Sequence, residues 1–358
     1  MTRKSWLFSA ILVVLAVLIH FLSKSTAWVE GSYANGFYPA WASFLRILFG
    51  WLPLSLGDIL YGAAFLWVVW KTIKATKALF KRQVTWQSFG KGLYKTGCIF
   101  LIIYIIFNLF WGINYNRKGV AFQLGLKMEK YSLDDLKNMN ALLVDKVNNA
   151  KQNLINSKAT YPSFKKLFEE VQQNYELIDS TYPFLQYNHL SLKPSVWSWL
   201  GNYVGFAGYY NPFTGEAQVN TTGPKFLHPY TACHEVAHQL GYAKEMEANF
   251  VGYLAASASK DTLFQYSVYL DLLIYSNRNL FFSDSASAHG YMKHLLPAIK
   301  TDLKQWDQFN RKHRNPMGPV IRWMYGKYLQ GNQQPQGILS YDEVTSFLIA
   351  YYKKFGKI

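Results

Sequence analysis

The sequence predicts a helical membrane region of about three transmembrane helices, followed by a mainly α, α+β domain. Two observations support this fold class. Half of the residues in the 358-residue chain are apolar, and the longest apolar segments lie in the first third, as is typical of membrane-spanning helices. From about residue 118 onward the composition becomes globular, with helical periodicity. We therefore expect a membrane region at residues 1–117 and a separate domain at residues 118–358.

Three apolar segments are each about long enough to cross a bilayer. The first, at about 6–23, follows a basic start and contains no Lys, Arg, Asp or Glu. The sequence after it fits a signal-peptide cleavage site poorly, which favours an uncleaved anchor. The second and third segments lie at about 56–72 and 97–114. An interfacial helix is expected near 37–51, where Trp and Tyr are frequent.

The distribution of basic residues predicts the orientation of these helices. The loop between the first and second segments has only Lys24 and Arg46. The loop between the second and third segments contains Lys71, Lys74, Lys77, Lys81, Arg82, Lys91 and Lys95. Because positively charged loops are retained in the cytoplasm, we expect the N-terminus inside and everything after Arg117 on the outer face.

The net charge of +16 is compatible with a nucleic-acid binder or with a membrane protein. Many of the basic residues flank apolar segments, so we favour the lipid bilayer as the partner and expect no nucleic acid. The chain has two cysteines, Cys98 and Cys233. Neither is placed to pair with the other, which excludes a disulfide framework.

The second part of the chain predicts several helices and one hairpin. Ser132, followed by acidic residues, predicts a helix start, and we expect Ser340 to cap the last helix. A hairpin is expected at 204–220, with turn signals at Asn211-Pro212 and Thr214-Gly215. The helices are expected at 133–155, from just after 162, at 262–280, at 286–313 and at 340–355.

The segment from residue 234 to 238 has the pattern H-E-x-x-H. On a helix, His234 and His238 share one face about 6 Å apart along the axis, so both imidazoles can reach one metal ion. Glu235 can then act as general base on a water held by that metal. Nitrogen and oxygen ligands in tetrahedral geometry favour Zn²⁺. The alternative is a surface helix with a polar patch, because so short a pattern also occurs by chance.

A catalytic zinc site needs a third protein ligand. Glu245 and Glu247 follow the motif, but on one unbroken helix Glu245 would lie about 16 Å beyond His234. Gly241 offers a turn back toward the metal. We favour Glu245 because it would share a helix face with Asn249, which could hydrogen-bond a ligating histidine. Glu247 is the alternative ligand, and the acid that does not bind is expected to be solvated.

HEVAHQLGYAKEMEANF resembles the H-E-x-x-H and E-x-E-A-N motifs of the bacterial family called domain of unknown function 3810. The resemblance extends to the membrane segments, to YYNPFTGEAQVN and to SYDEVTSFLIAYY. It implies a zinc metallopeptidase in the bacterial cytoplasmic (inner) membrane, with the domain on the periplasmic face. The motif is also similar to the E-x-x-x-D of gluzincins, which implies Glu245 as ligand; Asn249 departs from the usual Asp.

We therefore expect a zincin-like domain that hydrolyses peptide bonds, with a peptide or protein substrate of unknown sequence. A strand at 205–210 either binds extended substrate or is purely structural. The sequence does not choose an oxyanion stabiliser among Tyr266, Tyr269, His289 and Tyr291. Two rival functions remain: a non-catalytic membrane protein stapled by zinc, and a module that binds envelope polymers or anionic lipid.

Overall fold

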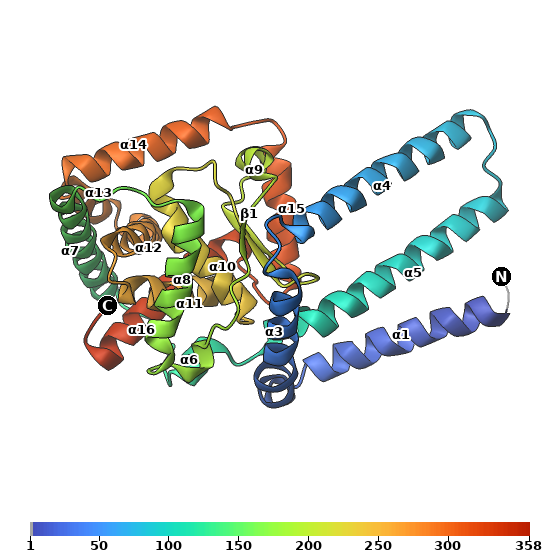
Figure 1. Ribbon diagram of the computed structural model, residues 1–358, viewed down its shortest axis with the longest axis horizontal. Helices are drawn as coiled ribbons and strands as arrows, with labels where there is room; N and C mark the ends of the chain where they lie inside the picture. The colour runs from blue at the N-terminus through green and yellow to red at the C-terminus, as the bar shows by residue number, and fades with distance from the viewer. Residues whose placement is uncertain (1–2) are drawn as a thin grey trace.

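The computed structural model describes residues 3–358 and is mainly helical (Figure 1). Residues 1–2, at the start of the predicted membrane region, lie outside the described part. Among the described residues, three helices are long and apolar enough to cross a membrane: α1 (Arg3–Ser23), α4 (Leu56–Phe80) and α5 (Trp86–Phe110). The three apolar segments predicted from the sequence are therefore all helical and long enough to span a membrane. The second helix is longer than predicted, and the third ends earlier, at Phe110.

The three apolar helices project from one side of the remaining domain (Figure 1). Helices α1 and α5 pack against each other, whereas α4 stands apart from them along most of its length. Between α1 and α4 the chain forms α2 (Thr26–Trp28), a π-helix (Val29–Phe37) and α3 (Tyr38–Phe49). Helix α3 corresponds to the predicted interfacial helix, and in Figure 1 it lies where the apolar helices α1 and α5 adjoin the domain.

Helices of the domain surround a large apolar core. The capping box predicted at Ser132 is present, since Ser132 and Asp135 exchange hydrogen bonds at the start of α7. The α-helices are α6 (Gly119–Gln123), α7 (Leu133–Ser157), α8 (Phe164–Asp179), α9 (Ser198–Val204), α10 (His228–Gln239), α11 (Glu245–Ala258), α12 (Thr262–Ser283), α13 (Ser285–Lys293), α14 (Pro297–Lys312), α15 (Gly318–Gly331) and α16 (Val344–Phe355). Short 3₁₀ helices lie at Gly112–Asn116, Pro183–Leu185, Lys225–Leu227 and Gly337–Tyr341.

Two helix predictions were wrong. The single helix expected at 286–313 is two helices, α13 and α14, because Pro297 disfavours helical geometry at Leu296, whose ψ is 147°. Ser340 does not cap the last helix; it lies in a 3₁₀ helix, and α16 begins at Val344. Helix α15 was not predicted at all.

The predicted hairpin is present, and it belongs to a three-stranded sheet. Strand β2 (Gly208–Asn211) pairs antiparallel with β3 (Glu216–Val219), and β1 (Leu192–Pro194) pairs parallel with the other side of β3. The strand order β1-β3-β2 places β2 at one edge of the sheet. The strand begins at Gly208 rather than at Gly205, because Gly205 ends α9 in the left-handed conformation.

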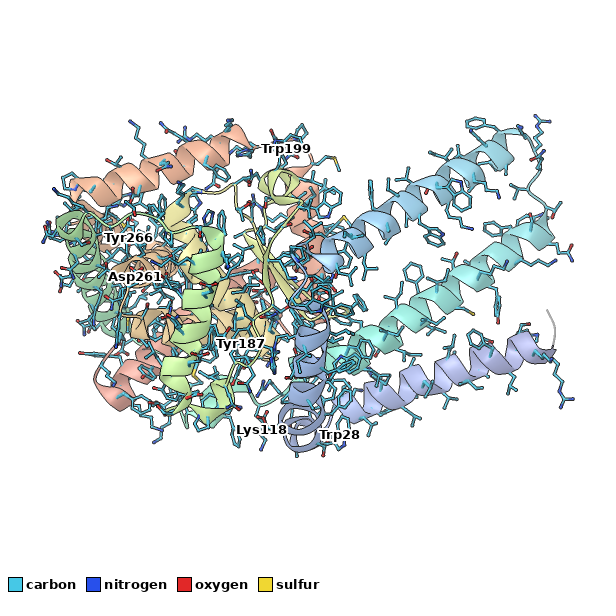
Figure 2. All side chains as sticks on the ribbon, viewed as in Figure 1. Trp28, Lys118, Tyr187, Trp199, Asp261 and Tyr266 are labelled. Atoms are coloured by element: carbon cyan, nitrogen blue, oxygen red, sulfur yellow. The ribbon has the colours of Figure 1, made fainter. Side chains whose placement is uncertain are left out.

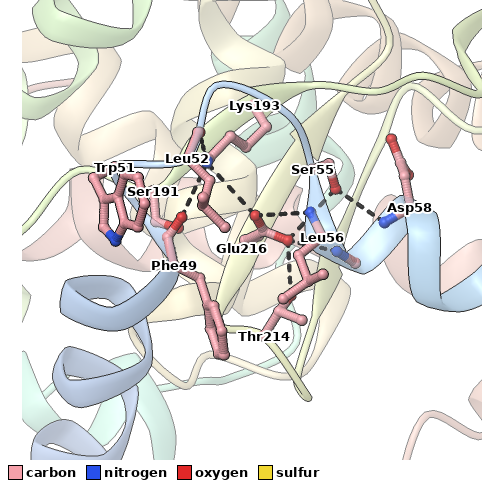
Figure 3. Close-up of polar contacts among 12 residues, drawn as sticks. Phe49, Trp51, Leu52, Ser55, Leu56, Asp58, Ser191, Lys193, Thr214 and Glu216 are labelled. Atoms are coloured by element: carbon pink, nitrogen blue, oxygen red, sulfur yellow. Dashed lines mark hydrogen bonds and ion pairs between the residues drawn. The ribbon is translucent and has the colours of Figure 1, made fainter.

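The membrane helix α4 is joined to this sheet by a buried carboxylate (Figure 3). Glu216 on β3 accepts hydrogen bonds from the backbone N–H groups of Leu56 and Gly57, at 3.2 and 2.6 Å. These are free N–H groups of the first helical turn, where a negative charge is stabilising. Lys193 on β1 lies 3.6 Å from Glu216 and donates to the carbonyls of Phe49 and Leu52. The sheet thus fixes the N-terminal end of α4, which adjoins the domain.

Candidate metal centre

A left-handed glycine brings the two motif helices together. Helix α10 carries His234, Glu235 and His238, and α11 begins at Glu245. Between them Gly241 has φ +86°, and its N–H donates to the carbonyl of His238 at 3.0 Å. A Cβ at this position would also lie 2.8 Å from the ring of Tyr38. Only glycine meets both demands without strain, and the predicted turn at Gly241 is confirmed.

The three predicted ligands meet at one point. Oε2 of Glu245 lies 3.3 Å from Nε2 of His234 and 3.5 Å from Nε2 of His238. All three ligand atoms lie within 4.8 Å of one another, and the three residues are buried. Two ligands about 2.1 Å from a tetrahedral ion are about 3.4 Å apart. These separations therefore suit a zinc ion, with two nitrogens and one carboxylate oxygen as donors.

Hydrogen bonds orient the imidazole of His238 more firmly than that of His234. Nδ1 of His238 lies 2.8 Å from the carbonyl oxygen of Tyr242; as a donor there, it leaves Nε2 free for a metal. Nδ1 of His234 has no hydrogen-bond partner in the described part of the chain. Burial lowers the pKa of His234, and Asn249 is a small opposing influence; the amide nitrogen of Asn249 donates to the carbonyl of Tyr341 at 3.3 Å.

Glu235 is buried beside the cluster, and its Oε2 has no hydrogen-bond partner among residues 3–358. Burial raises the pKa of this carboxyl to about 8. Strand β2 makes room for it, since a Cβ on Gly208 would lie 2.5 Å from Oε1 of Glu235. An unpaired buried carboxylate is costly, so its presence here suggests a role in binding or moving a proton.

The charges at the site favour a bound cation. Burial acts to lower the pKa of His238, but the Glu245 carboxylate outweighs it and raises that pKa to about 9. Burial acts to raise the pKa of Glu245, but the imidazoles outweigh it and hold that pKa well below its usual range. Burial keeps the pKa of His234 low. Without a metal, the positive charge of protonated His238 offsets the negative charge of Glu245. A bound divalent cation could offset that charge instead.

Glu247, the alternative ligand, lies apart from this cluster. It is buried against Gly119, where a Cβ would approach its Oε1 to 1.8 Å. Burial raises its pKa, and the nearby charges of Lys244 and Arg117 oppose that rise. The expectation that the acid outside the ligand cluster would be solvated was therefore wrong. Glu247 packs where the domain meets the segment that follows α5.

Sequence reasoning missed the tyrosines that cover the site. The hydroxyl of Tyr325, on α15, donates to Oε1 of Glu245 at 2.8 Å and lies 3.1 Å from the hydroxyl of Tyr341. The ring of Tyr341 lies nearly parallel to that of His234, with centroids 6.3 Å apart. The spacing of Val320, Trp323 and Met324 could have indicated α15, but nothing local distinguishes Tyr325 among 26 tyrosines.

The tyrosines and histidine that the sequence left open as oxyanion stabilisers have other partners. The hydroxyl of Tyr266 donates to Asp302, and Nδ1 of His289 lies 2.7 Å from the carbonyl of Ser285. Tyr269 lies under Lys146, with the ammonium 5.6 Å from the ring centroid. Tyr291 packs against the core.

Residues from the first part of the chain contact the C-terminal end of α10. Tyr38 on α3 donates to the carbonyl of Gln239 at 2.9 Å, and the indole of Trp111 donates to that of His238 at 3.2 Å. These carbonyls belong to the last turn of α10, where the regular helical hydrogen bonds end. Arg117 forms a buried ion pair with Glu30 at 3.6 Å. The cluster of candidate metal ligands is therefore anchored to the part of the chain that carries the apolar helices.

The chain matches a family described as Protein of unknown function (DUF3810), over residues 33–349. The match includes α4, α5, the hairpin and both motif helices, and it confirms the resemblance seen in the sequence. No curated protein and no solved structure matches the chain.

Proposed function

The chain belongs to the DUF3810 family, and from the chemistry of its site we propose that it is a membrane-anchored zinc metallopeptidase. One observation carries the proposal. The ligand atoms of His234, His238 and Glu245 converge within 4.8 Å, and the buried, unpaired carboxylate of Glu235 lies beside them. This combination of three protein ligands and an adjacent base is typical of a hydrolytic zinc site.

Each residue has a distinct part in the proposed reaction. A zinc ion bound by the three ligands would polarise a substrate carbonyl and lower the pKa of water. Glu235 would accept a proton from that water and deliver it to the leaving amine. Tyr325 would keep Glu245 in its ligating orientation through its hydrogen bond.

Strand β2 is the proposed docking edge for substrate. It is an edge strand, and its first residue, Gly208, contacts the carboxylate of Glu235. An extended peptide could pair with the backbone of such an edge. This would bring a scissile bond close to Glu235, and it extends the zincin-like interpretation of the domain.

We further propose that the domain lies on the periplasmic face of a bacterial inner membrane. Support comes from the seven basic residues between Lys71 and Lys95, which lie in the last turns of α4, the loop that follows it and the first turns of α5. Such loops are retained in the cytoplasm. The metal centre lies at the opposite ends of these helices (Figure 1).

Metal analysis of purified full-length protein tests the zinc site. We expect close to one zinc per chain in the wild type, loss of zinc in His238→Ala and Glu245→Ala, and retention in Glu235→Gln. Glu247→Ala is the matched control, because Glu247 is a buried acid of the same helix that lies apart from the ligands. Absence of zinc from metal-replete wild type would contradict the proposal and favour a binding module.

A cleavage assay then distinguishes a catalytic zinc site from a purely structural one. A library of extended peptides should be cleaved by the wild type and by Glu247→Ala but not by Glu235→Gln. Zinc that is bound with complete exclusion of water and without any cleavage would support the non-catalytic alternative.

A further inference from the structure

Helix α15 has two different faces. One face carries Tyr325 toward the metal ligand Glu245. The other exposes Val320, Trp323 and Met324, with side chains that are 46%, 64% and 60% exposed. Residues at i, i+3 and i+4 share one side of a helix, so these three form one apolar surface. Such a surface marks an interaction site more often than chance exposure.

Helix α9 lies next to α15. Asn315, just before α15, donates to the carbonyl of Tyr203 on α9 at 2.7 Å. On α9 itself Trp199 and Leu200 are also exposed, and Figure 2 shows Trp199 on the side of the domain next to α4. We call Trp199, Leu200, Val320, Trp323 and Met324 the apolar ledge.

The ledge is attached to the membrane helices at both ends. At one end, Trp197 precedes α9 and donates to the carbonyl of Asp58 in the first turn of α4, at 3.0 Å. At the other end, the hydroxyl of Tyr328 on α15 lies 3.2 Å from that of Tyr115, which follows α5. Helix α15 thus extends across the outer ends of α4 and α5, as Figure 1 shows. Any bilayer that contains these helices must end close to the ledge.

The charge around the ledge suits a lipid surface. Residues 308–341 include five Lys or Arg residues and no Asp or Glu. Arg314, Arg322 and Lys327 are exposed beside the apolar side chains. Apolar side chains bordered by basic ones bind the interface of membranes that contain anionic lipid.

We propose that the apolar ledge lies in the outer surface of the bilayer, between the ends of α4 and α5. Helix α15 then forms a roof with lipid on one side and the metal centre on the other. Its continuity with α4 and α5 favours lipid over a second protein as the occupant. The metal centre would consequently be approached at the level of the lipid headgroups.

A site-specific fluorophore tests this contact in the full-length protein. Met324→Cys is labelled with nitrobenzoxadiazole and placed in vesicles containing phosphatidylglycerol. Its fluorescence should lie at a shorter wavelength than that of the same fluorophore in buffer without detergent. Lipids with a doxyl group near the headgroup should quench it at least about twofold. Gln152→Cys on α7 is the matched control, since it is exposed on the far side of the domain from α4 and α5. The unsubstituted protein measures labelling of the buried Cys98 and Cys233.

Equal, weak quenching at positions 324 and 152 would overturn the proposal. Shielding of position 324 that depends on protein concentration, without doxyl quenching, would show contact with a second copy and would also overturn it. Adding His238→Ala to the labelled protein should leave the quenching unchanged. The quenching experiment therefore tests lipid contact independently of zinc binding.

Discussion

Glu235 and Glu247 are both buried acids near the motif, but they differ in their surroundings. Glu247 fits against Gly119 where the domain meets the segment after α5, whereas Glu235 has a free oxygen beside two imidazoles. Helical phase and the resemblance to the gluzincin motif favoured Glu245 over Glu247 in the sequence, and the structure brings Glu245 to the cluster. The burial of Glu247 could not be predicted, because it depends on Gly119, which is distant in sequence.

Zinc binding should weaken as the pH falls. Without metal, Glu245 holds the pKa of His238 near 9, so at neutral pH the imidazole carries a proton that zinc must displace. The affinity should therefore fall by up to about tenfold per pH unit below 9. Calorimetry at pH 7 in buffers of different ionisation enthalpy should show release of about one proton per zinc. An affinity independent of pH between 6 and 9 would contradict this.

Gly208 is expected to matter for cleavage and not for metal binding. In Gly208→Ala the added Cβ would overlap Oε1 of Glu235 and approach the carbonyl of Gln218. The general base would be displaced, and loss of a positioned base typically lowers the rate by about 10²–10⁴-fold. Turnover should therefore fall while the zinc content stays at the wild-type value. Gly290→Ala, where a Cβ meets nothing within 4 Å, should leave both unchanged.

At the scale of elements, local sequence patterns were sufficient to predict the two motif helices. They were not sufficient to predict the other elements that complete the site. H-E-x-x-H, Gly241 and the following acids lie within one short stretch, so spacing predicts their geometry. Tyr325 reaches Glu245 from 80 positions later in the chain, and no periodicity encodes such a contact. The sheet order β1-β3-β2 likewise depends on a parallel crossover that the predicted hairpin did not contain.

The turn between α10 and α11 should be intolerant of a side chain. In Gly241→Ala the left-handed conformation costs about 1–2 kcal/mol, and the clash with Tyr38 adds to it. We expect a lower melting temperature and weaker zinc binding, because the turn sets the position of Glu245. Gly90→Ala in α5 is the control: its Cβ meets nothing within 4 Å, and it should be neutral or slightly stabilising. Unchanged zinc affinity in Gly241→Ala would show that the turn can relax.

At the scale of the whole molecule, the predicted boundary near residue 117 lies inside a packed region. One buried cluster contains Tyr33, Tyr38 and Trp111 from the first part of the chain together with Tyr210 and Ala243 from the second. Sequence composition separates a membrane region from a globular one, but it does not show how closely the two pack. Through this contact, the segments next to the apolar helices help to support the candidate metal centre.

A truncated chain containing only residues 118–358 should therefore fail to form the zinc site. Tyr38 and Trp111, which hydrogen-bond the last turn of α10, would be missing, and the side of Tyr210 that packs against them would be exposed. We expect low soluble yield and less than stoichiometric zinc after purification. A chain starting at residue 24, which lacks only α1, should retain zinc in detergent. Full zinc occupancy in the shorter chain would show that the domain folds independently.

The carboxylate of Glu216 has a consequence for the order of events during synthesis. Helix α4 emerges from the ribosome about 160 residues before the side chain that holds its first turn. The helix must therefore enter the bilayer before Glu216 can hold the N–H groups of Leu56 and Gly57, with only Ser55 capping its first turn, and its position along the membrane normal is fixed only when β3 forms. A nascent chain halted before residue 216 would leave α4 free to slide, so completion of the later domain sets the final depth of an earlier transmembrane helix.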